Sequence, residues 1–157
     1  MPNWCENKLT VLGSKEEIEQ IKSKLFRQNI ESDELSLDFN LVAPIPRELK
    51  EGIYWCGRNW GTKWNATTCS VDIEDEKITC FFDTAWNPPL AWFRTLCQKF
   101  SQYEIEFYYY EPGWEFAGSL ANSNGDFYYT RELNSDNDIK EFAYETFGIC
   151  FDDEDDK

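Results

Sequence analysis

The chain has 157 residues, of which 41% are hydrophobic and 17% aromatic, and its 30 acidic and 15 basic residues give a formal net charge of −15. A chain of this length is most simply one domain and can bury an ordinary core without disulfides. Its acidity disfavours broad nucleic-acid binding, which needs cations to displace counterions from phosphates. The lack of any apolar run of about 18 residues excludes a membrane-spanning helix.

The first half of the chain predicts two strands, one helix and a long loop. Alternating apolar residues predict a strand over residues 7–13. A capping-box pattern at Ser14 predicts a helix that runs to about Asn29. Strict alternation over residues 35–41 predicts a second strand, which ends before the prolines that follow. Residues 47–66 show no sustained period, so a loop is expected there.

The second half predicts a hairpin, a helix, a strand, another hairpin and a final helix. The first hairpin covers residues 69–82, and Asn87 is expected to cap the helix that follows it. A strand is predicted over residues 103–109. The second hairpin pairs residues 114–121 with 127–130, and Ser135 is expected to cap the last helix, which Gly148 stops.

This order of elements indicates an α+β fold of the ferredoxin-like, split βαβ type. We expect a mostly antiparallel sheet with helices on one face, extra hairpin strands and a C-terminal helix. Residues 1–150 are expected to form this single domain. The acidic tail, residues 151–157, is expected to be disordered because it has few groups to bury.

Cysteine usage and the N-terminal residues indicate a cytoplasmic protein without a cofactor. The six cysteines include no C-x-x-C pair and the chain has no histidine, so no zinc site or other metal centre is expected. The cysteines are expected to be structural thiols in a reducing compartment. Residues 1–6 lack the basic and apolar regions of a secretory signal.

Tryptophan is concentrated in two short segments, and this is the most informative feature of the chain. Five of the seven tryptophans lie between Trp55 and Trp92. They occupy residues 53–64, here called the first tryptophan segment, and residues 84–92, the second. Both segments mix indoles with turn-forming and hydrogen-bonding residues. We expect the two segments to converge on a solvent-reachable hollow at one end of the sheet.

Each segment allows a binding interpretation and a packing interpretation. Indoles of the first segment are spaced to stack on a flat ligand, with Lys63 and Arg58 meeting an anion. Packing is the slightly favoured interpretation of this segment, because a long connection is often pinned to the sheet by its own side chains. Trp86 is expected to pack as a hydrophobic staple next to the Asn87 cap. The candidate binding residues are Trp55, Arg58, Asn59, Trp60, Thr62, Lys63, Trp64, Trp86, Asn87 and Trp114.

Four sequence blocks resemble the YubB-like family of small proteins from plasmids, phages and prophage-bearing genomes. They are Met1–Cys5 together with Asn7, Asn59–Asn65, Thr84–Pro89 and Tyr110–Gly113. The resemblance covers residues 1–118, about three quarters of the chain. It implies a ferredoxin-like fold and a mobile-element setting, and it brings no catalytic residues with it.

No catalytic constellation is present in the sequence, so a non-enzymatic protein is expected. Nucleophile elbow, Walker loop and G-x-G-x-x-G patterns are absent, as is histidine, the commonest general base. Cys56 beside Arg58 is a poor candidate nucleophile. Glu104, Glu106, Glu111 and Glu115 admit a carbohydrate hydrolase with paired carboxylates, although alternation with core residues is typical of a solvated strand face.

The leading hypothesis is therefore a binding protein of a mobile element that docks a host or element-encoded protein through the tryptophan segments. Acidity favours a basic partner surface. A counter-defence inhibitor, such as an anti-CRISPR or anti-restriction protein, is one concrete version. The alternatives are an aromatic platform for a small ligand or single-stranded nucleic acid, and the carbohydrate hydrolase.

Overall fold

The computed structural model describes residues 2–49, 52–113 and 116–152. Trp114, Glu115 and residues 153–157 of the predicted tail lie outside the described residues. The helices and strands follow in chain order: β1 (Trp4–Leu12), α1 (Lys15–Leu25), β2 (Phe26–Gln28), β3 (Leu35–Leu37), η1 (Phe39–Leu41), α2 (Ile53–Asn59), β4 (Thr67–Ile73), β5 (Lys77–Ala85), α3 (Leu90–Lys99), β6 (Glu104–Glu111), β7 (Phe116–Ser123), β8 (Asp126–Leu133) and α4 (Asp136–Phe147).

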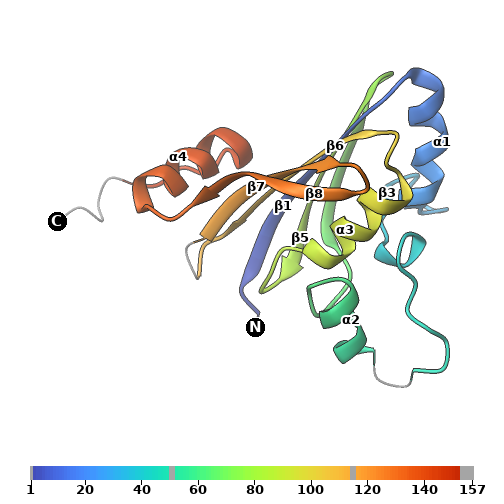
Figure 1. Ribbon diagram of the computed structural model, residues 1–157, viewed down its shortest axis with the longest axis horizontal. Coiled ribbons are helices and arrows are strands. Elements are labelled where there is room, and N and C mark those ends of the chain that lie inside the picture. The colour runs from blue at the N-terminus through green and yellow to red at the C-terminus, as the bar shows by residue number, and fades with distance from the viewer. Residues whose placement is uncertain (1, 50–51, 114–115, 153–157) are drawn as a thin grey trace.

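One antiparallel sheet of six strands, in the order β4-β5-β1-β6-β7-β8, organises the fold (Figure 1). Its first four strands, with α1 after β1 and α3 after β5, form the split βαβ unit of the ferredoxin-like fold. The β7–β8 hairpin extends the sheet beyond β6. The predicted α+β, ferredoxin-like fold class is therefore confirmed.

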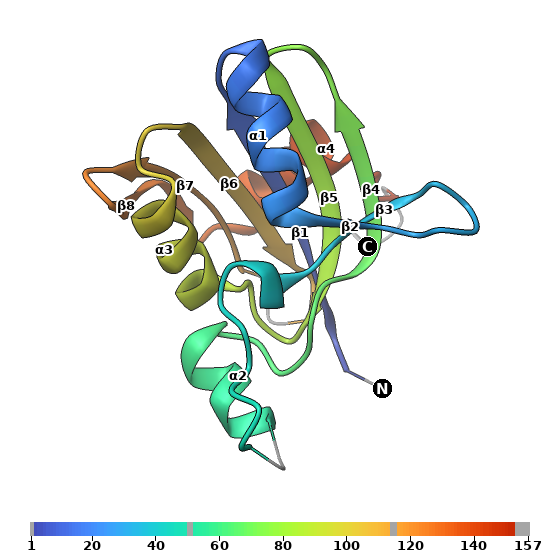
Figure 2. The same ribbon diagram turned by 90° about the vertical axis from the view of Figure 1, so that its right-hand side faces the viewer.

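Helices cover the two faces of the sheet unequally. Figure 2 shows α1 and α3 on one face and α4 on the other. The main core lies beneath α1 and α3, where Leu9 of β1 and Phe93 of α3 are fully buried. A smaller cluster joins Phe142 of α4 to Tyr110 of β6 on the opposite face. None of the helices within the described ranges is long and apolar enough to cross a membrane.

The connection between α1 and β4 differs from the predicted helix and strand. The capping box at Ser14 is confirmed, but α1 ends at Leu25, and β2 then pairs with β3 in a separate two-stranded sheet. The predicted strand over residues 35–41 is wrong beyond Leu37. There the side chain of Asp38 accepts a hydrogen bond from the Asn40 amide at 2.9 Å and starts the short 3₁₀ turn η1.

Two further predictions around the tryptophan segments are wrong. Part of the expected loop is helix α2, which buries Cys56. Asn87 does not cap α3, which begins at Leu90 after Pro89. Instead the Asn87 amide donates to the Ala85 carbonyl at 2.8 Å and its own carbonyl accepts from the Thr84 hydroxyl at 2.7 Å. These bonds hold Asn87 in a tight turn ahead of the helix.

The remaining hairpins, caps and the last helix form as predicted, but α4 lies on the face opposite α1 and α3, whereas helices were expected on one face (Figure 2). Both hairpins form, and the second turns at Asn124 and Gly125 with left-handed φ angles of 50° and 77°. The Ser135 side chain caps α4 by accepting from the Asp138 amide, and Gly148 ends the helix in the left-handed conformation. Such caps and turns are local, so they are readable from sequence.

Candidate functional site

The two tryptophan segments are joined to each other at one end of the sheet. The Thr62 hydroxyl donates to the Ala85 carbonyl at 2.8 Å, and the Trp92 amide donates to the Trp60 carbonyl at 3.1 Å. Gly61 has φ 86°, and a Cβ atom there would lie 3.1 Å from the Leu90 nitrogen. The close backbone approach therefore depends on glycine.

Trp60 and Thr62 are core residues, so the prediction that they contact a ligand is wrong. The Trp60 side chain is 1% exposed, its Nε1 donates to the Ala43 carbonyl at 2.9 Å and its ring packs edge-on against Phe39. Thr62 is also buried. A buried indole needs a hydrogen-bond partner, and the Ala43 carbonyl supplies one.

The residues predicted on the first segment before Trp60 lie on α2. Trp55 is half-buried and packs edge-on against Trp60, with ring centroids 5.8 Å apart. Arg58 and Asn59 are exposed, and the Asn59 side-chain amide donates to the Trp55 carbonyl at 2.9 Å. Trp55 and Asn59 thus have local structural roles, whereas Arg58 is free to meet solvent or a partner.

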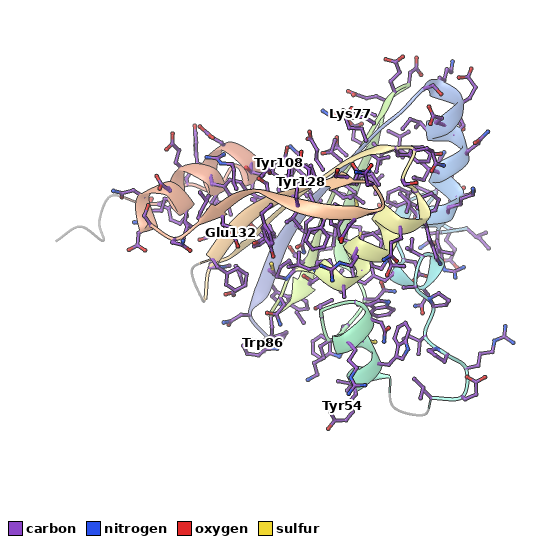
Figure 3. All side chains as sticks on the ribbon, viewed as in Figure 1. Tyr54, Lys77, Trp86, Tyr108, Tyr128 and Glu132 are labelled. Atoms are coloured by element: carbon purple, nitrogen blue, oxygen red, sulfur yellow. The ribbon has the colours of Figure 1, made fainter. Side chains whose placement is uncertain are left out.

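Among the tryptophans that the structure describes, three remain accessible at the end of the sheet where β1 begins and β5 ends. Trp4, Trp64 and Trp86 are 37%, 41% and 38% exposed, and we call them the tryptophan surface. The rings of Trp4 and Trp64 are 6.4 Å apart, and the Trp86 amide donates to the Asn3 carbonyl at 2.8 Å. Figure 3 shows Trp86 at this lower end, opposite Lys77 at the upper end.

Trp4 was not among the predicted site residues. The prediction began the first strand at residue 7, whereas β1 begins at Trp4, which pairs with Ala85. Its position beside the second tryptophan segment follows from that pairing. The signal available in the sequence was a tryptophan ahead of a strand, and only the strand register shows which segment it meets.

Trp86 combines exposure with an unfavourable backbone conformation. Its φ angle is 69°, in the left-handed region that large side chains seldom adopt. Such a residue costs about 1–3 kcal/mol relative to a relaxed backbone. Asn87 beside it is also exposed. The predicted staple role of Trp86 is wrong, because α3 is capped at Pro89 and Trp86 therefore does not stand directly before the cap.

Lys63 places a cation on the tryptophan surface. Its ammonium nitrogen lies 5.0 Å from the centre of the Trp64 ring, within the range of a cation–π contact. Both side chains are exposed. Lys63 and Trp64 are therefore brought together as the sequence predicts, while Arg58 belongs to a separate helix.

Next to the tryptophan surface lies a hollow of about 700 Å³, which we call the acidic hollow. Its lining includes Asn3, Trp4, Glu6, Asp83, Tyr110 and Phe151. Glu6 pairs directly with Asp83 across β1 and β5 and with Tyr110 across β1 and β6. The three side chains therefore project from the same face of the sheet.

Three carboxyl groups line the acidic hollow, those of Glu6, Asp83 and Glu111, and the pKa values of Glu6 and Asp83 are raised. Burial raises the pKa of Glu6, and the neighbouring Asp83 charge raises it further. Burial also raises the pKa of Asp83, although a hydrogen bond from the Thr68 side chain opposes the change. Within the described residues, Glu6 Oε2 is buried and has no hydrogen-bond partner. Both groups thus favour a state with less negative charge.

A second hollow, of about 470 Å³, lies at the junction of the two tryptophan segments and is lined by Gly61, Asn87 and Tyr109, among others. No tryptophan of the described ranges lines it. The predicted single hollow lined by Trp60, Trp64 and Trp86 is therefore wrong, because Trp60 lies in the core and the other two form an open surface.

Two of the glutamates considered for hydrolysis, Glu104 and Glu106, alternate with buried residues on β6, as is typical of a solvated strand face. Glu104 and Glu111 lie at the opposite ends of β6, farther apart than the separation of about 5–10 Å between the two carboxyl groups of a glycosidase. Glu106 accepts a hydrogen bond from the Tyr108 hydroxyl at 2.9 Å. Glu115 lies outside the described residues. Burial raises the pKa of the Cys56 thiol, which opposes its use as a nucleophile.

Comparisons with known proteins place the chain in a family. The family described as "Ferredoxin-like domain in Api92-like protein" matches residues 60–149, more than half of the chain. A solved structure, that of protein api92 from Yersinia pseudotuberculosis, has a TM-score of 0.61 at 10% identity, covering 86% of this chain and 99% of that chain. At that identity the likeness concerns the fold alone. No curated protein matches the sequence. The chain therefore belongs to the family of ferredoxin-like domains in Api92-like proteins.

Proposed function

We propose that this protein is a non-enzymatic binding protein that docks a basic protein partner through the tryptophan surface. The observation that carries the proposal is the exposure of three indoles at one end of the sheet, one of them on strained backbone. Tryptophan is enriched among residues that dominate protein interfaces. Strained residues persist where the surrounding structure holds them, often at functional sites. Trp86 meets both criteria.

Charge supports a basic partner over an acidic one. The chain carries a net charge of −15, and the acidic hollow places Glu6 and Asp83 beside Trp4. Complementary charge mainly speeds association and selects among partners. A partner with an exposed cationic surface, including a nucleic-acid-binding protein, is the favoured class.

The resemblance of four sequence blocks to the YubB-like family supports a mobile-element setting inside a bacterial cell. In that setting an acidic binding protein serves as a counter-defence inhibitor, for example an anti-CRISPR or anti-restriction protein. Its carboxylates compete with nucleic-acid phosphates for the basic surface of the target. This version of the proposal rests on the resemblance and on the charge.

A second candidate function is an aromatic platform for single-stranded nucleic acid. The contact of Lys63 with the exposed Trp64 ring favours it, because stacking and a nearby cation are the usual elements of such platforms. Glu6 and Asp83 lie close to Trp4 in the same region and repel phosphates. Charge therefore ranks this candidate second.

An affinity capture with matched variants tests the proposal. The tagged full chain would be incubated with lysate of a bacterial host, and the captured proteins compared with those taken by Trp64→Ala and by Trp86→Gly. Tyr54→Ala is the control, because Tyr54 is an exposed aromatic residue on α2 that points away from the sheet (Figure 3).

The proposal expects one protein that both tryptophan variants lose and Tyr54→Ala retains. A captured set that is the same for all four proteins would contradict it. Labelled single-stranded oligonucleotides at low salt test the second candidate. Binding that weakens as salt rises and loses about 1–3 kcal/mol in Trp64→Ala would favour nucleic acid over protein.

A further inference from the structure

We propose that the acidic hollow binds the guanidinium group of an arginine side chain from the protein partner. This proposal rests on the proposed function and names the chemistry that the partner would present. The acidic hollow and the tryptophan surface share one residue, Trp4. The occupant of the hollow is inferred from charge and from the shape of the lining.

The first step is the unbalanced charge in the hollow. Glu6 and Asp83 are direct neighbours across β1 and β5, and both are half-buried. The two ion pairs found within the described residues, Arg27–Asp38 and Arg94–Asp126, involve neither of them. Glu6 Oε2, moreover, is buried without a hydrogen-bond partner among the described residues. A cation from outside that lies beside the two carboxylates would relieve their mutual repulsion.

The second step is the kind of cation. A metal ion of the calcium type needs about six or more oxygen ligands. No group of three or more metal-binding side chains occurs among residues 2–49, 52–113 and 116–152. The hollow instead combines the carboxylates of Glu6, Asp83 and Glu111 with the rings of Trp4, Tyr110 and Phe151. An organic cation therefore fits the lining better than a metal ion does.

The third step selects guanidinium over ammonium. A guanidinium group is planar, stacks on aromatic faces and presents a fork of donors that matches carboxylates. Trp4 supplies an exposed indole, and the Tyr110 ring meets Phe151 edge-on with centroids 6.5 Å apart. A volume of about 700 Å³ accommodates the head of one arginine side chain together with water.

The hollow and the tryptophan surface are continuous through two residues. Trp4 lines the hollow and contacts Trp64, while Asn3 lines it and accepts the hydrogen bond from the Trp86 amide. A partner seated on Trp64 and Trp86 therefore places its neighbouring side chains at the mouth of the hollow. Tryptophan, tyrosine and arginine are the residues enriched among those that dominate the binding energy of interfaces.

A titration with single-residue probes tests the inference. Acetyl-arginine amide carries one guanidinium group, and acetyl-citrulline amide has nearly the same shape without the charge. Each would be added to the isotope-labelled full chain at physiological ionic strength while backbone amide signals are recorded. The arginine probe should shift the signals of Glu6, Asp83 and Tyr110, and the citrulline probe should leave them in place.

Charge-matched variants separate a site from general attraction to an acidic protein. In the double variant Glu6→Gln, Asp83→Asn the arginine probe should bind about tenfold more weakly or worse, as expected for the loss of charge-assisted hydrogen bonds. The control double variant Asp75→Asn, Glu76→Gln removes the same charge in the β4–β5 turn, at the other end of β5. It should bind the arginine probe like the unaltered chain.

Equal weakening in both double variants, or shifts spread evenly over the acidic surface, would overturn the inference. So would equal binding of the citrulline probe. The unaltered chain alone decides the question if the variants do not fold, because its shifts either cluster at the hollow or do not. Failure here with partner capture still dependent on Trp64 and Trp86 rejects only the guanidinium site. Loss of that dependence rejects the proposed function.

Discussion

The Thr62 hydroxyl donates a 2.8 Å hydrogen bond to the Ala85 carbonyl and so connects the two tryptophan segments across 23 residues of sequence. Both groups are buried, and the same carbonyl also accepts from the Asn87 amide at 2.8 Å. The bond fixes the chain just before Trp64 against the end of β5, where Trp86 begins its turn. This single bond therefore helps to position the indoles of both Trp64 and Trp86.

Replacing Thr62 by valine should lower the free energy of unfolding by about 1 kcal/mol, the usual value of one hydrogen bond. The loss stays small because Asn87 continues to satisfy the Ala85 carbonyl. Urea unfolding would measure it. Thr67→Val is the control, because Thr67 is exposed and its hydroxyl bond to the Asp83 carbonyl is long, at 3.4 Å. Equal loss in the two variants would contradict the role of the Thr62 bond.

Trp60 and Trp64 lie four positions apart, yet truncation should destabilise the chain far more at Trp60 than at Trp64. Trp60→Ala removes a fully buried indole and should cost about 3–5 kcal/mol of unfolding free energy. Trp64→Ala removes a 41% exposed ring and should cost well under half of that. Urea unfolding of both variants decides. Similar losses would place the two indoles in the same environment, against the structure.

Trp86 should tolerate glycine better than Trp64 does. Glycine adopts a φ of 69° without strain, so Trp86→Gly should keep the unfolding free energy within about 1 kcal/mol of the unaltered chain. Trp64 is not among the residues with positive φ, so Trp64→Gly should lose stability through the entropy of the unfolded chain. Thermal unfolding of the pair gives the comparison. A larger loss of stability in Trp86→Gly would mean that packing of the Trp86 indole contributes more than the strain of its backbone costs.

Local patterns made much of this fold predictable. The capping box at Ser14, the cap at Ser135 and the turn at Asn124 and Gly125 each depend on residues a few positions apart. Alternation of apolar residues placed the strands of the main sheet. The break after Leu37 was not predictable, because Asp38 acts there through long-range bonds: Asn65, 27 positions away, donates to it at 2.8 Å.

The candidate site was predictable in position but not in detail. Composition drew attention to the two tryptophan segments, which indeed meet through Thr62 and Ala85. Whether an indole is buried depends on the surface that faces it, and period-free segments carry no information on that point. Trp60 meets Phe39 from a distant turn, whereas Trp64 meets Trp4 at the edge. The Glu6–Asp83 pair required the register of β1 and β5.

The buried thiols should be protected from reagents in the folded chain. Burial raises the pKa of Cys97 to about 12 and also raises the pKa of Cys5, where the Glu111 charge adds to the effect. Among the six cysteines only Cys150 is exposed. A thiol reagent at neutral pH should therefore modify Cys150 rapidly and Cys5 and Cys97 only on unfolding. Rapid reaction of a Cys150→Ser variant at either buried position would contradict this.

The contribution of Glu6 and Asp83 to the free energy of unfolding should depend on pH in the opposite direction to that of Asp38. Burial raises the pKa of Glu6 and of Asp83 above the ordinary values, so the folded state binds protons more readily than the unfolded state. Their contribution is most favourable below the ordinary pKa of about 4 and declines as pH rises through the raised values. At Asp38, burial is outweighed by hydrogen bonds from Arg27, Asn65 and Asn40, which lower its pKa. Its contribution is present above the ordinary pKa and is lost as pH falls through the lowered value.

Two variants separate these contributions. Glu6→Gln should raise the unfolding free energy at neutral pH relative to the unaltered chain, with the difference vanishing in acid. Asp38→Asn should lower it at neutral pH, with that difference also shrinking as pH falls. Urea unfolding of the three proteins across the acid range gives both curves. A destabilising effect of Glu6→Gln at neutral pH would show that the Glu6 carboxylate already has a stabilising partner, and the case for an external cation in the acidic hollow would then fail.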